Sequence, residues 1–588
     1  MKVKHHLLTI CVLSLMASSA SKTLGQTNYE WRSEAANGNW HAPTHWWIGS
    51  ATSAGFGVMR FNNNAHLSMT NNNGGITFAT HAIDFRSGNT STRTLNGDAI
   101  RLFDNGGADP YILNTSSATH VINLNLRGDG DAGDPLLILL DGTGGLTFNG
   151  TLNNEGSNIN VQGSTSTANT VTFGGVISGS GGLFKTNSNI TAVFNATNTF
   201  TGTTTVEAGT IQLGASGASF GGDSSAVRLG ANGIMDLNGF DTTVRYVSER
   251  GTGDSGIVTL GGGTLTIQDN GSTTRFQSSI NGAGNVVYDS AATSVLSLFN
   301  AQGWTGSTTV KGGLLTSAGA MQTSAINVEG GTFRVTGSDN RLAANPTMVL
   351  SGGIFHSQTH ESIQSIQATG GRVEIDAGRT LTLLGGGTLG AATELRGGTL
   401  RVENGTLNYH SSDTSNTTAL AIAGGQLIIP ETSTAFIHST TVSSGAMIID
   451  GELGGGTINV AANATFGGTG ILSADLFLHE DSAFQISSVM QPLTAEGAIS
   501  FGSGFGIANL FGIDWDAVGL GAHTIISSTQ DFSLAGLANF GFANRVAVGS
   551  NGREAYFQNG SLQVVVIPEP TTALLGGLGV LLLFRRRR

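Results

Sequence analysis

The sequence returns repeatedly to a Gly-Gly-Thr triplet followed by a short run in which apolar side chains alternate with polar ones. Four copies, GGTLTI, GGTFRV, GGTLRV and GGTINV, begin at Gly262, Gly330, Gly397 and Gly455. Successive side chains of a strand point to opposite faces, so each copy predicts a strand with one buried row and one solvent-facing row. The glycines before each strand suit turns with positive φ.

The spacing of these glycines predicts how the strands assemble. Double glycines begin at Gly330, Gly352, Gly370, Gly397 and Gly424, in steps of 22, 18, 27 and 27 residues. One coil of this length cannot bury its apolar row, but coils stacked about 4.8 Å apart can bury it in a continuous column. We therefore expect an all-β parallel β-helix, or β-solenoid, of on the order of 22–27 coils and about 100–130 Å. A β-propeller is the competing repeat fold, but its blades need periods nearer about 40–50 residues.

Two longer segments also match each other, Ile177 to Gly214 and Ile280 to Gly319. They share I-x-G-x-G, an apolar strand and then [FW]-T-G-[ST]-T-T-V-x-x-G. This pattern resembles the autotransporter-associated β-strand repeat, also called the passenger-associated transport repeat. The resemblance implies a right-handed parallel β-helix in an exported surface protein. The first copy keeps the pattern at Leu183, Lys185, Phe200, Thr201, Gly202, Val206, Gly209 and Ile211.

The N-terminal segment, residues 1–26, has the layout of a secretory signal peptide. Lys2 and Lys4 precede an apolar run from Leu7 to Met16, and small residues follow. We expect it to be removed on export; a retained anchor or buried helix is the alternative, and the short apolar run argues against it. The single cysteine, Cys11, lies inside it, so the exported body is expected to lack disulfides and to rely on packing and hydrogen bonds.

The C-terminal segment, residues 568–588, is a Pro-Glu-Pro motif followed by an apolar run and a basic end. The apolar run from Thr571 to Phe584 would make a helix of about 21 Å, short for a bilayer core of about 30 Å, and the arginines would stay on the cytoplasmic side. The order of these parts resembles the PEP-CTERM sorting signal; an unprocessed hydrophobic helix is the alternative. The resemblance implies a short transmembrane sorting helix, recognised by an exosortase at Pro568, Glu569 and Pro570, with a membrane stop at Arg585, Arg586, Arg587 and Arg588.

Four segments follow from these features. We expect a signal peptide at 1–26, a β-helix at 27–480, C-terminal coils or a cap at 481–567 and the sorting signal at 568–588. The solenoid ends need covering because an open end exposes unpaired strand edges.

Tryptophans cluster near the start of the body, at Trp31, Trp40, Trp46 and Trp47. Such a cluster can stack on sugar rings in a glycan site. It can equally seal the first coil as an N-terminal cap, and the cap is the interpretation we favour.

The overall charge and composition narrow the partners. The formal net charge is −12, only 11% of the residues are charged, and 39% are apolar. Regularly placed apolar residues indicate an ordered chain. An acidic body repels nucleic acid, so no nucleic-acid partner is expected; membrane contact is expected through the C-terminal segment.

Paired carboxylates are the candidates for catalysis, because β-helices often carry polysaccharide lyases and hydrolases, and glycoside hydrolysis needs two facing carboxylates. Asp514 with Asp516, and Asp450 with Glu452, have the spacing that places two groups on one face of a strand. Each pair is more simply a solvated turn or strand edge. The GDSG sequence at 253–256 lacks the histidine segment of a serine protease and is interpreted as coincidence.

Two segments carry residues that could bind a metal ion. Asp129, Asp131 and Asp134 lie in RGDGDAGDP, a glycine-rich turn whose carboxylates could wrap calcium, although the position of the EF-hand glutamate is Leu140. His356, His360 and Glu361 would suit zinc on a helix, but this region is predicted as strand and loop. The sequence therefore predicts one metal site, a calcium loop at Asp129, Asp131 and Asp134, and no other cofactor is expected.

Two functions remain open from the sequence. The first is an exported, non-catalytic rod at the cell surface or in the extracellular matrix, acting in adhesion, the envelope or a biofilm matrix. Its expected partners are an exosortase-type processing enzyme, exopolysaccharide and other surface proteins. The alternative is a secreted polysaccharide lyase or hydrolase on a β-helix scaffold. The scarcity of charge on the repeats favours the first.

Overall fold

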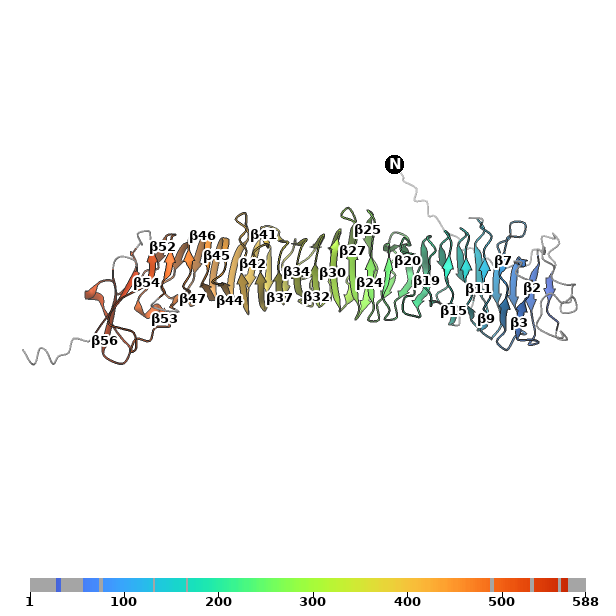
Figure 1. The fold of residues 1–588 in the computed structure, drawn as a ribbon, viewed down its shortest axis with the longest axis horizontal. Helices are drawn as coiled ribbons and strands as arrows, with labels where there is room; N and C mark the ends of the chain where they lie inside the picture. Colours follow the sequence, from blue (N-terminus) through green and yellow to red (C-terminus); the bar gives the residue numbers. More distant parts are fainter. Residues whose placement is uncertain are drawn as a thin grey trace, which may run out of the picture.

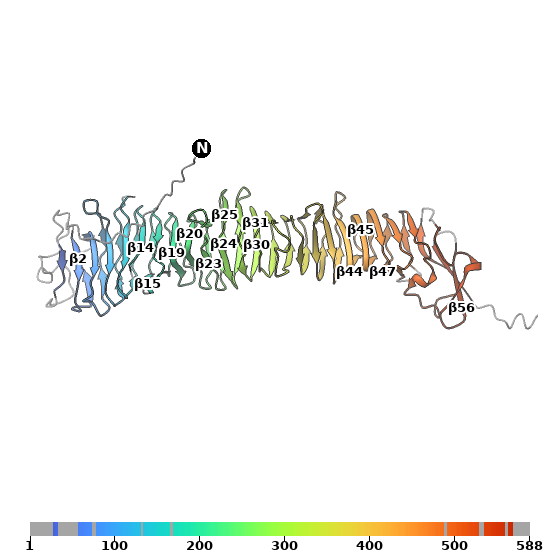
Figure 2. The same cartoon turned by 180° about the vertical axis from the view of Figure 1, so that it is seen from behind.

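The computed structural model describes residues 28–32, 57–72, 78–130, 133–164, 168–486, 491–528, 534–558 and 562–568. Over these residues the chain is an all-β solenoid of about 20 turns, as the repeats predict. Figures 1 and 2 show a single rod, with β2 (Val58–Phe61) near one end and β56 (Arg553–Gln558) at the other. The predicted signal peptide and C-terminal helix lie outside the described residues. No helix in the described part is long and apolar enough to cross a membrane.

Each strand pairs in parallel with the equivalent strand of the next coil. β30 (Ser307–Gly312) pairs with β32 (Ala325–Val328), which pairs with β34 (Thr347–Leu350). Coil length varies, because Ala82 pairs with Tyr111 near the N-terminus whereas Phe466 pairs with Phe484 near the other end. The described strands form ladders of 19, 5, 26 and 7 strands.

Two of these ladders are short enough to give in full. The five-stranded ladder comprises β4 (Phe78–Thr80), β7 (Ile100–Leu102), β10 (Leu126–Arg127), β13 (Leu152–Asn153) and β16 (Ile177–Ser178). The seven-stranded ladder comprises β25 (Thr273–Phe276), β28 (Val295–Leu298), β31 (Leu314–Ser317), β33 (Thr332–Val335), β35 (Ile354–Ser357), β38 (Arg372–Ile375) and β41 (Glu394–Arg396).

The 19-stranded ladder includes the strands of the first long repeat. Its members in this region are β15 (Asn169–Phe173), β17 (Leu183–Lys185), β18 (Ile190–Phe194), β19 (Thr204–Leu213), β20 (Val227–Asp236) and β22 (Val247–Glu249). The 26-stranded ladder holds the longest strands, β44 (Ala419–Ile429), β45 (Thr434–Ile449) and β46 (Glu452–Val460).

The Gly-Gly-Thr strands bury the residues that the alternation predicts. The inward rows are fully or almost fully buried, and the residues between them are partly or well exposed. Removing such side chains from water contributes about 1.5–3 kcal/mol each, so the inner column is the main source of stability. The buried pairs are Leu265 with Ile267, Phe333 with Val335, Leu400 with Val402, and Ile458 with Val460.

Glycines stack at one corner of the rod because the backbone of each coil passes close to the next. Gly331, Gly353 and Gly371 have φ of +63°, +65° and +78°. A Cβ on Gly353 would lie 2.6 Å from the carbonyl oxygen of Gly331, and one on Gly371 would lie 2.7 Å from that of Gly353. The corner therefore admits no side chain.

Identical side chains also stack from coil to coil. The rings of Phe148 and Phe173 are 5.4 Å apart between centroids, and those of Phe173 and Phe194 are 5.3 Å apart, all nearly parallel. On the outer surface of the rod, the side-chain amide of Asn123 donates to Asn96, and that of Asn149 donates to Asn123, both at 2.8 Å. Both stacks follow the spacing of the coils, about 4.8 Å.

The C-terminal end departs from the parallel pattern. β54 (Gly521–Ser528) pairs in parallel with β51 (Leu493–Ala495) but antiparallel with β57 (Leu562–Pro568). β57 pairs antiparallel with β56, and β56 with β55 (Val546–Val548). We call β55–β57 the antiparallel cap, because it lies against the last coil. Two short 3-10 helices, η2 (Ile507–Asn509) and η3 (Phe542–Asn544), also occur here.

Candidate functional site

The Asp514 and Asp516 carboxylates hold loops together. Asp514 Oδ1 accepts the backbone N–H groups of Asp516 and Ala517, each at 3.1 Å. Asp516 accepts the hydroxyl and the N–H of Ser550, both at 2.7 Å, and these bonds lower its pKa. Asp516 therefore remains ionised and ties its loop to the antiparallel cap.

The second acidic pair also bonds to neighbouring coils. Asp450 accepts the backbone N–H of Thr469 at 3.2 Å, and Glu452 accepts the hydroxyl of Thr434 at 3.2 Å. Glu452 thus bonds to the preceding coil and Asp450 to the following coil, so the two carboxylates do not act as a pair.

The three residues weighed as zinc ligands, His356, His360 and Glu361, take part in separate interactions. Glu361 is buried, which raises its pKa, and it accepts the backbone N–H groups of Arg341 and Leu342 at 3.0 and 2.9 Å. The Nε2 atom of His356 lies 2.8 Å from Asp376, whereas the backbone N–H of His360 donates to Asp339 at 3.0 Å. Glu361 thus closes a turn of the neighbouring coil.

The described part of the predicted calcium loop contains Asp129 and Asp134. Asp129 accepts Arg101 Nη2 at 2.9 Å and the backbone N–H of Asp104 at 2.8 Å. Asp134 lies near Asp109, which is outside the predicted loop. Burial first, and then the negative charge of Asp134, raise the pKa of Asp109. Asp131 lies outside the described residues, so the calcium loop stays a prediction.

A different group of potential metal ligands follows β49 (Asp475–Leu478), and sequence reasoning missed it. His479, Glu480 and Asp481 each offer one ligand atom, and these atoms lie within 4.8 Å of one another. The three residues are consecutive, so the plain His-Glu-Asp triplet was the available signal. They are at least partly exposed at a turn, where such groups commonly remain solvated.

The described member of the tryptophan cluster faces inward. Trp31 is fully buried and packs near Phe61, with 6.4 Å between ring centroids. Its ring is therefore unavailable for stacking on a sugar. Trp40, Trp46 and Trp47 lie outside the described residues.

Two buried basic side chains, Arg93 and Lys185, have structural roles that the sequence did not indicate. Arg93 donates to the carbonyl oxygens of Asn63, Ala65 and His66 at 2.6–2.9 Å, and burial lowers its pKa to about 10. Lys185, the lysine of the long repeat, donates to the carbonyl oxygens of Asn187 and Ala208, and burial lowers its pKa to about 7. Both bind loops from within the rod, and neither lies in an open site.

One outer face of the rod carries two hollows. Outward residues of β17, β19, β20 and β22 pair in the order Phe184, Thr205, Arg228 and Ser248. A hollow of about 380 Å³ lies beside Phe184 and Thr205. A second, of about 540 Å³, is lined by Glu249, Arg250, Gly251, Thr252, Arg275 and Gln277.

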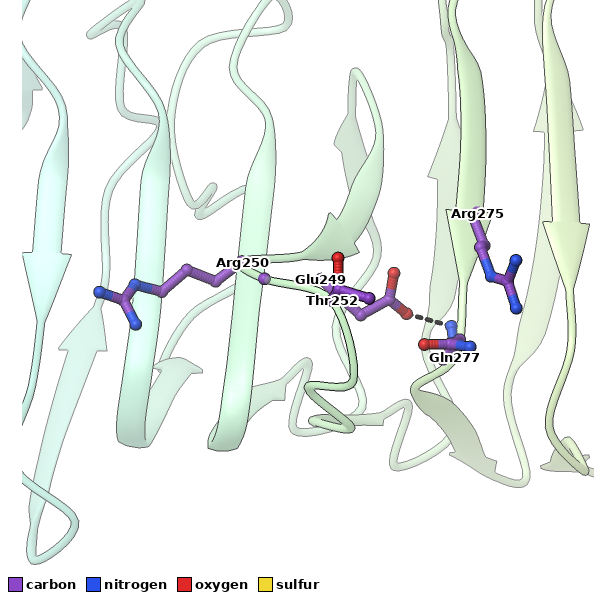
Figure 3. A pocket seen from close by; sticks show the side chains of 6 residues that line it. Glu249, Arg250, Thr252, Arg275 and Gln277 are labelled. Carbon is purple, nitrogen blue, oxygen red and sulfur yellow. Dashed lines mark hydrogen bonds between the residues drawn. The ribbon is translucent and has the colours of Figure 1, made fainter. Parts of the chain in front are cut away.

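Figure 3 shows how the side chains around the larger hollow are arranged. Glu249 lies between the two arginines and accepts the backbone N–H groups of Gln277 and Ser278. Arg250 extends away from Arg275, toward Glu207 at 3.2 Å. The Arg275 guanidinium lies 4.0 Å over the ring of Phe299. The arrangement is open and elongated, without groups converging on one atom.

Comparison with known proteins gives one similarity. A stretch of 237 residues is 36% identical to the adhesin BmaC autotransporter of Brucella suis biovar 1 (strain 1330). The match takes in 37% of this chain but 7% of that adhesin, so the chain spans a small fraction of its relative. No protein-family model matches the chain, and no solved structure matches it. The similarity and the β-solenoid together fit repeats of the autotransporter passenger type.

Proposed function

We propose that this protein is an exported surface rod that acts by adhesion, without catalysis. The local identity to an autotransporter adhesin is the observation that carries the proposal. The fold supports it, because stacked coils present long outer ladders, one of which carries a column of asparagines, and such ladders suit extended binding surfaces. The envelope and an exopolysaccharide or biofilm matrix are the proposed settings.

A role as a polysaccharide lyase or hydrolase has no comparable support. In the described part of the chain, the acidic pairs that such an enzyme would use accept hydrogen bonds from turns and neighbouring coils. A hydrolase of this kind needs two carboxylates free to face a sugar.

The proposal includes sorting through the C-terminal PEP-CTERM-like tail by an exosortase. The last described strand, β57, ends at Pro568, which is exposed and is the first residue of the motif. Recognition at this point would leave the parallel coils intact. The acidic composition agrees with a partner other than nucleic acid.

Attachment of the producing bacterium tests the proposal. We expect deletion of the gene to reduce attachment or matrix retention, and the full-length gene to restore it. A complementing copy with Pro568→Ala, Glu569→Ala and Pro570→Ala should fail to reach its final surface location, measured by fractionation. Unchanged attachment after deletion would contradict an adhesive role.

Incubation of the purified full-length protein with a polysaccharide panel, with calcium present, tests the absence of catalysis. We expect no new reducing ends and no unsaturated products by mass spectrometry. Cleavage of any polymer would overturn the non-catalytic proposal and direct attention to the acidic pairs.

A further inference from the structure

The outer face formed by β17, β19, β20, β22 and β25 contains a break in the ladder. Arg228 of β20 pairs with Ser248 of β22, but the next strand in contact, β25, starts a separate ladder. The chain between them includes the loop at 250–256. This interruption produces the larger hollow, between Glu249 and Arg275.

The smaller hollow lies on the same face, toward the N-terminus. Glycines line it, including Gly181, Gly182 and Gly202, so its floor is backbone. Phe184 borders it, and the guanidinium of Arg250 lies 5.9 Å from the centre of that ring. Arg250 also lines the larger hollow, so it links the two along the axis of the rod.

The arginines on this face differ in their partners. Among the described residues, Arg228 and Arg275 form no ion pair, and both are exposed. Further along the rod, by contrast, Arg372 and Arg396 both pair with Glu394. The described structure therefore leaves two positive charges on this face without a carboxylate, in a chain of net charge −12.

The nearby acidic groups are largely engaged. Glu207 pairs with Arg250 at 3.2 Å, and Glu249 accepts two backbone N–H groups. Asp254 lies in the same loop, and its carboxylate is close to Gly251. Its negative charge weakens the attraction of the arginines for an anion. Charges more than about 8 Å away are largely screened at physiological salt. The electrostatic potential at this face therefore depends on the charged groups that lie on it more than on the net charge of the whole rod.

We propose that this face binds a linear anionic polysaccharide, with uronate carboxylates pairing with Arg228 and Arg275 on either side of the larger hollow. Guanidinium groups match carboxylates with two parallel hydrogen bonds. The two arginines stand on strands about two coil spacings, roughly 10 Å, apart. Because the hollows are open and lie along the rod, the arrangement suits a polymer better than a small molecule. This inference rests on the proposed binding function and assigns it a ligand class.

Binding of the full-length protein to polygalacturonate, with dextran as the neutral comparison, tests this. We expect binding to polygalacturonate alone, weakened by added salt. Arg228→Gln with Arg275→Gln should weaken it roughly tenfold, as expected for the loss of two exposed charge pairs, and Asp254→Asn should strengthen it. Arg101→Gln with Arg127→Gln, equally exposed arginines paired with Asp129 and Glu155, should change it less than twofold.

Several results would overturn the inference. These are equal binding of dextran, no binding of polygalacturonate, or equal losses in the two arginine double variants. Thermal unfolding of each variant checks that the fold is retained. If the Arg228/Arg275 variant restores attachment of the deletion strain fully, the ligand assignment fails and the adhesive function stands; if deletion itself has no effect, the adhesive function fails.

Discussion

At the scale of single residues, the rod places a few ionisable groups inside its wall and gives them neutral partners. His120 is fully buried, and its ring stacks on Phe85 with 4.3 Å between centroids. Its Nδ1 accepts the backbone N–H of Arg93 at 3.0 Å, and its Nε2 lies 2.8 Å from the hydroxyl of Ser116. Burial first, and then the charge of Arg93, lower its pKa to about 4.

This pKa makes the N-terminal coils sensitive to acid. Between pH 4 and the usual value of 6.5, the unfolded chain binds a proton at His120 that the folded chain excludes. The contribution of the neutral His120 to the stability of the fold is therefore fully present above about pH 6.5, and it is lost as the pH drops toward 4. We expect the protection of amides in residues 82–122 against hydrogen exchange, corrected for the intrinsic exchange rate at each pH, to fall over this range more than in residues 380–410.

The variant His120→Gln tests the assignment. It should reduce the acid sensitivity of those coils without abolishing it, because burial also lowers the pKa of His81 nearby. The same pH dependence in the variant and the wild type would show that His120 is not responsible.

Residue contacts of this kind could not be predicted from the sequence. Asp516 and Ser550 are 34 positions apart, and Arg93 bonds to three carbonyls nearly 30 positions earlier. The sequence identifies the carboxylates and the basic groups, but their partners depend on loop lengths that bring distant coils into contact. The unpaired state of Arg228 and Arg275 is likewise visible only once the coils are stacked.

At the scale of elements, the double-glycine corner and the strand that follows it form one unit. The strand buries two side chains, and the corner turns the chain where no Cβ fits. The alternation and the turn were both readable from the sequence, because periodicity and glycine content are local properties. The phenylalanine stack was not, since Phe148, Phe173 and Phe194 are unevenly spaced and align only through the register of their strands.

The substitution Gly353→Ala tests the corner. The new Cβ would lie 2.6 Å from the oxygen of Gly331, at a φ of +65°. We expect a loss of about 2–4 kcal/mol of local stability, from the left-handed backbone and the contact together. Hydrogen exchange in β33, β35 and β38 measures it.

Gly378 provides a matched control. Its φ is +75°, but a Cβ there would have nothing within 4 Å. Gly378→Ala should therefore cost only the backbone strain, about 1–2 kcal/mol. Equal effects of the two substitutions would show that the close approach of the coils contributes nothing.

At the scale of the whole molecule, the sequence predicted the class of fold. The described residues form about 20 turns, where about 22–27 coils were expected for the whole exported body. The N-terminal coils are longer than assumed, since Ala82 pairs with Tyr111. The final strands also leave the parallel stack and form antiparallel pairs. At about 4.8 Å per turn, the solenoid is about 95 Å long.

The antiparallel cap covers an edge of β54 through β57, and we expect it to protect the last coil. Deleting residues 546–568 removes β55–β57 and exposes the unpaired edge of β54. Because open edges pair with other chains, we expect oligomers or aggregates by light scattering after size-exclusion chromatography. Deleting residues 569–588 is the control and should leave the cap intact. A monomeric protein after the first deletion would indicate that the cap is not needed for this purpose.

The parallel ladders also determine how the rod responds to tension. The hydrogen bonds between coils run along the axis, and each coil contacts mainly its neighbours. A pull at the two ends therefore opens the end coils first, one after another. Each coil of roughly 25 residues occupies about 4.8 Å when stacked but supplies roughly 85 Å of extended chain when released. A tether built in this way lengthens under load before it breaks, so it dissipates the work of a sudden pull.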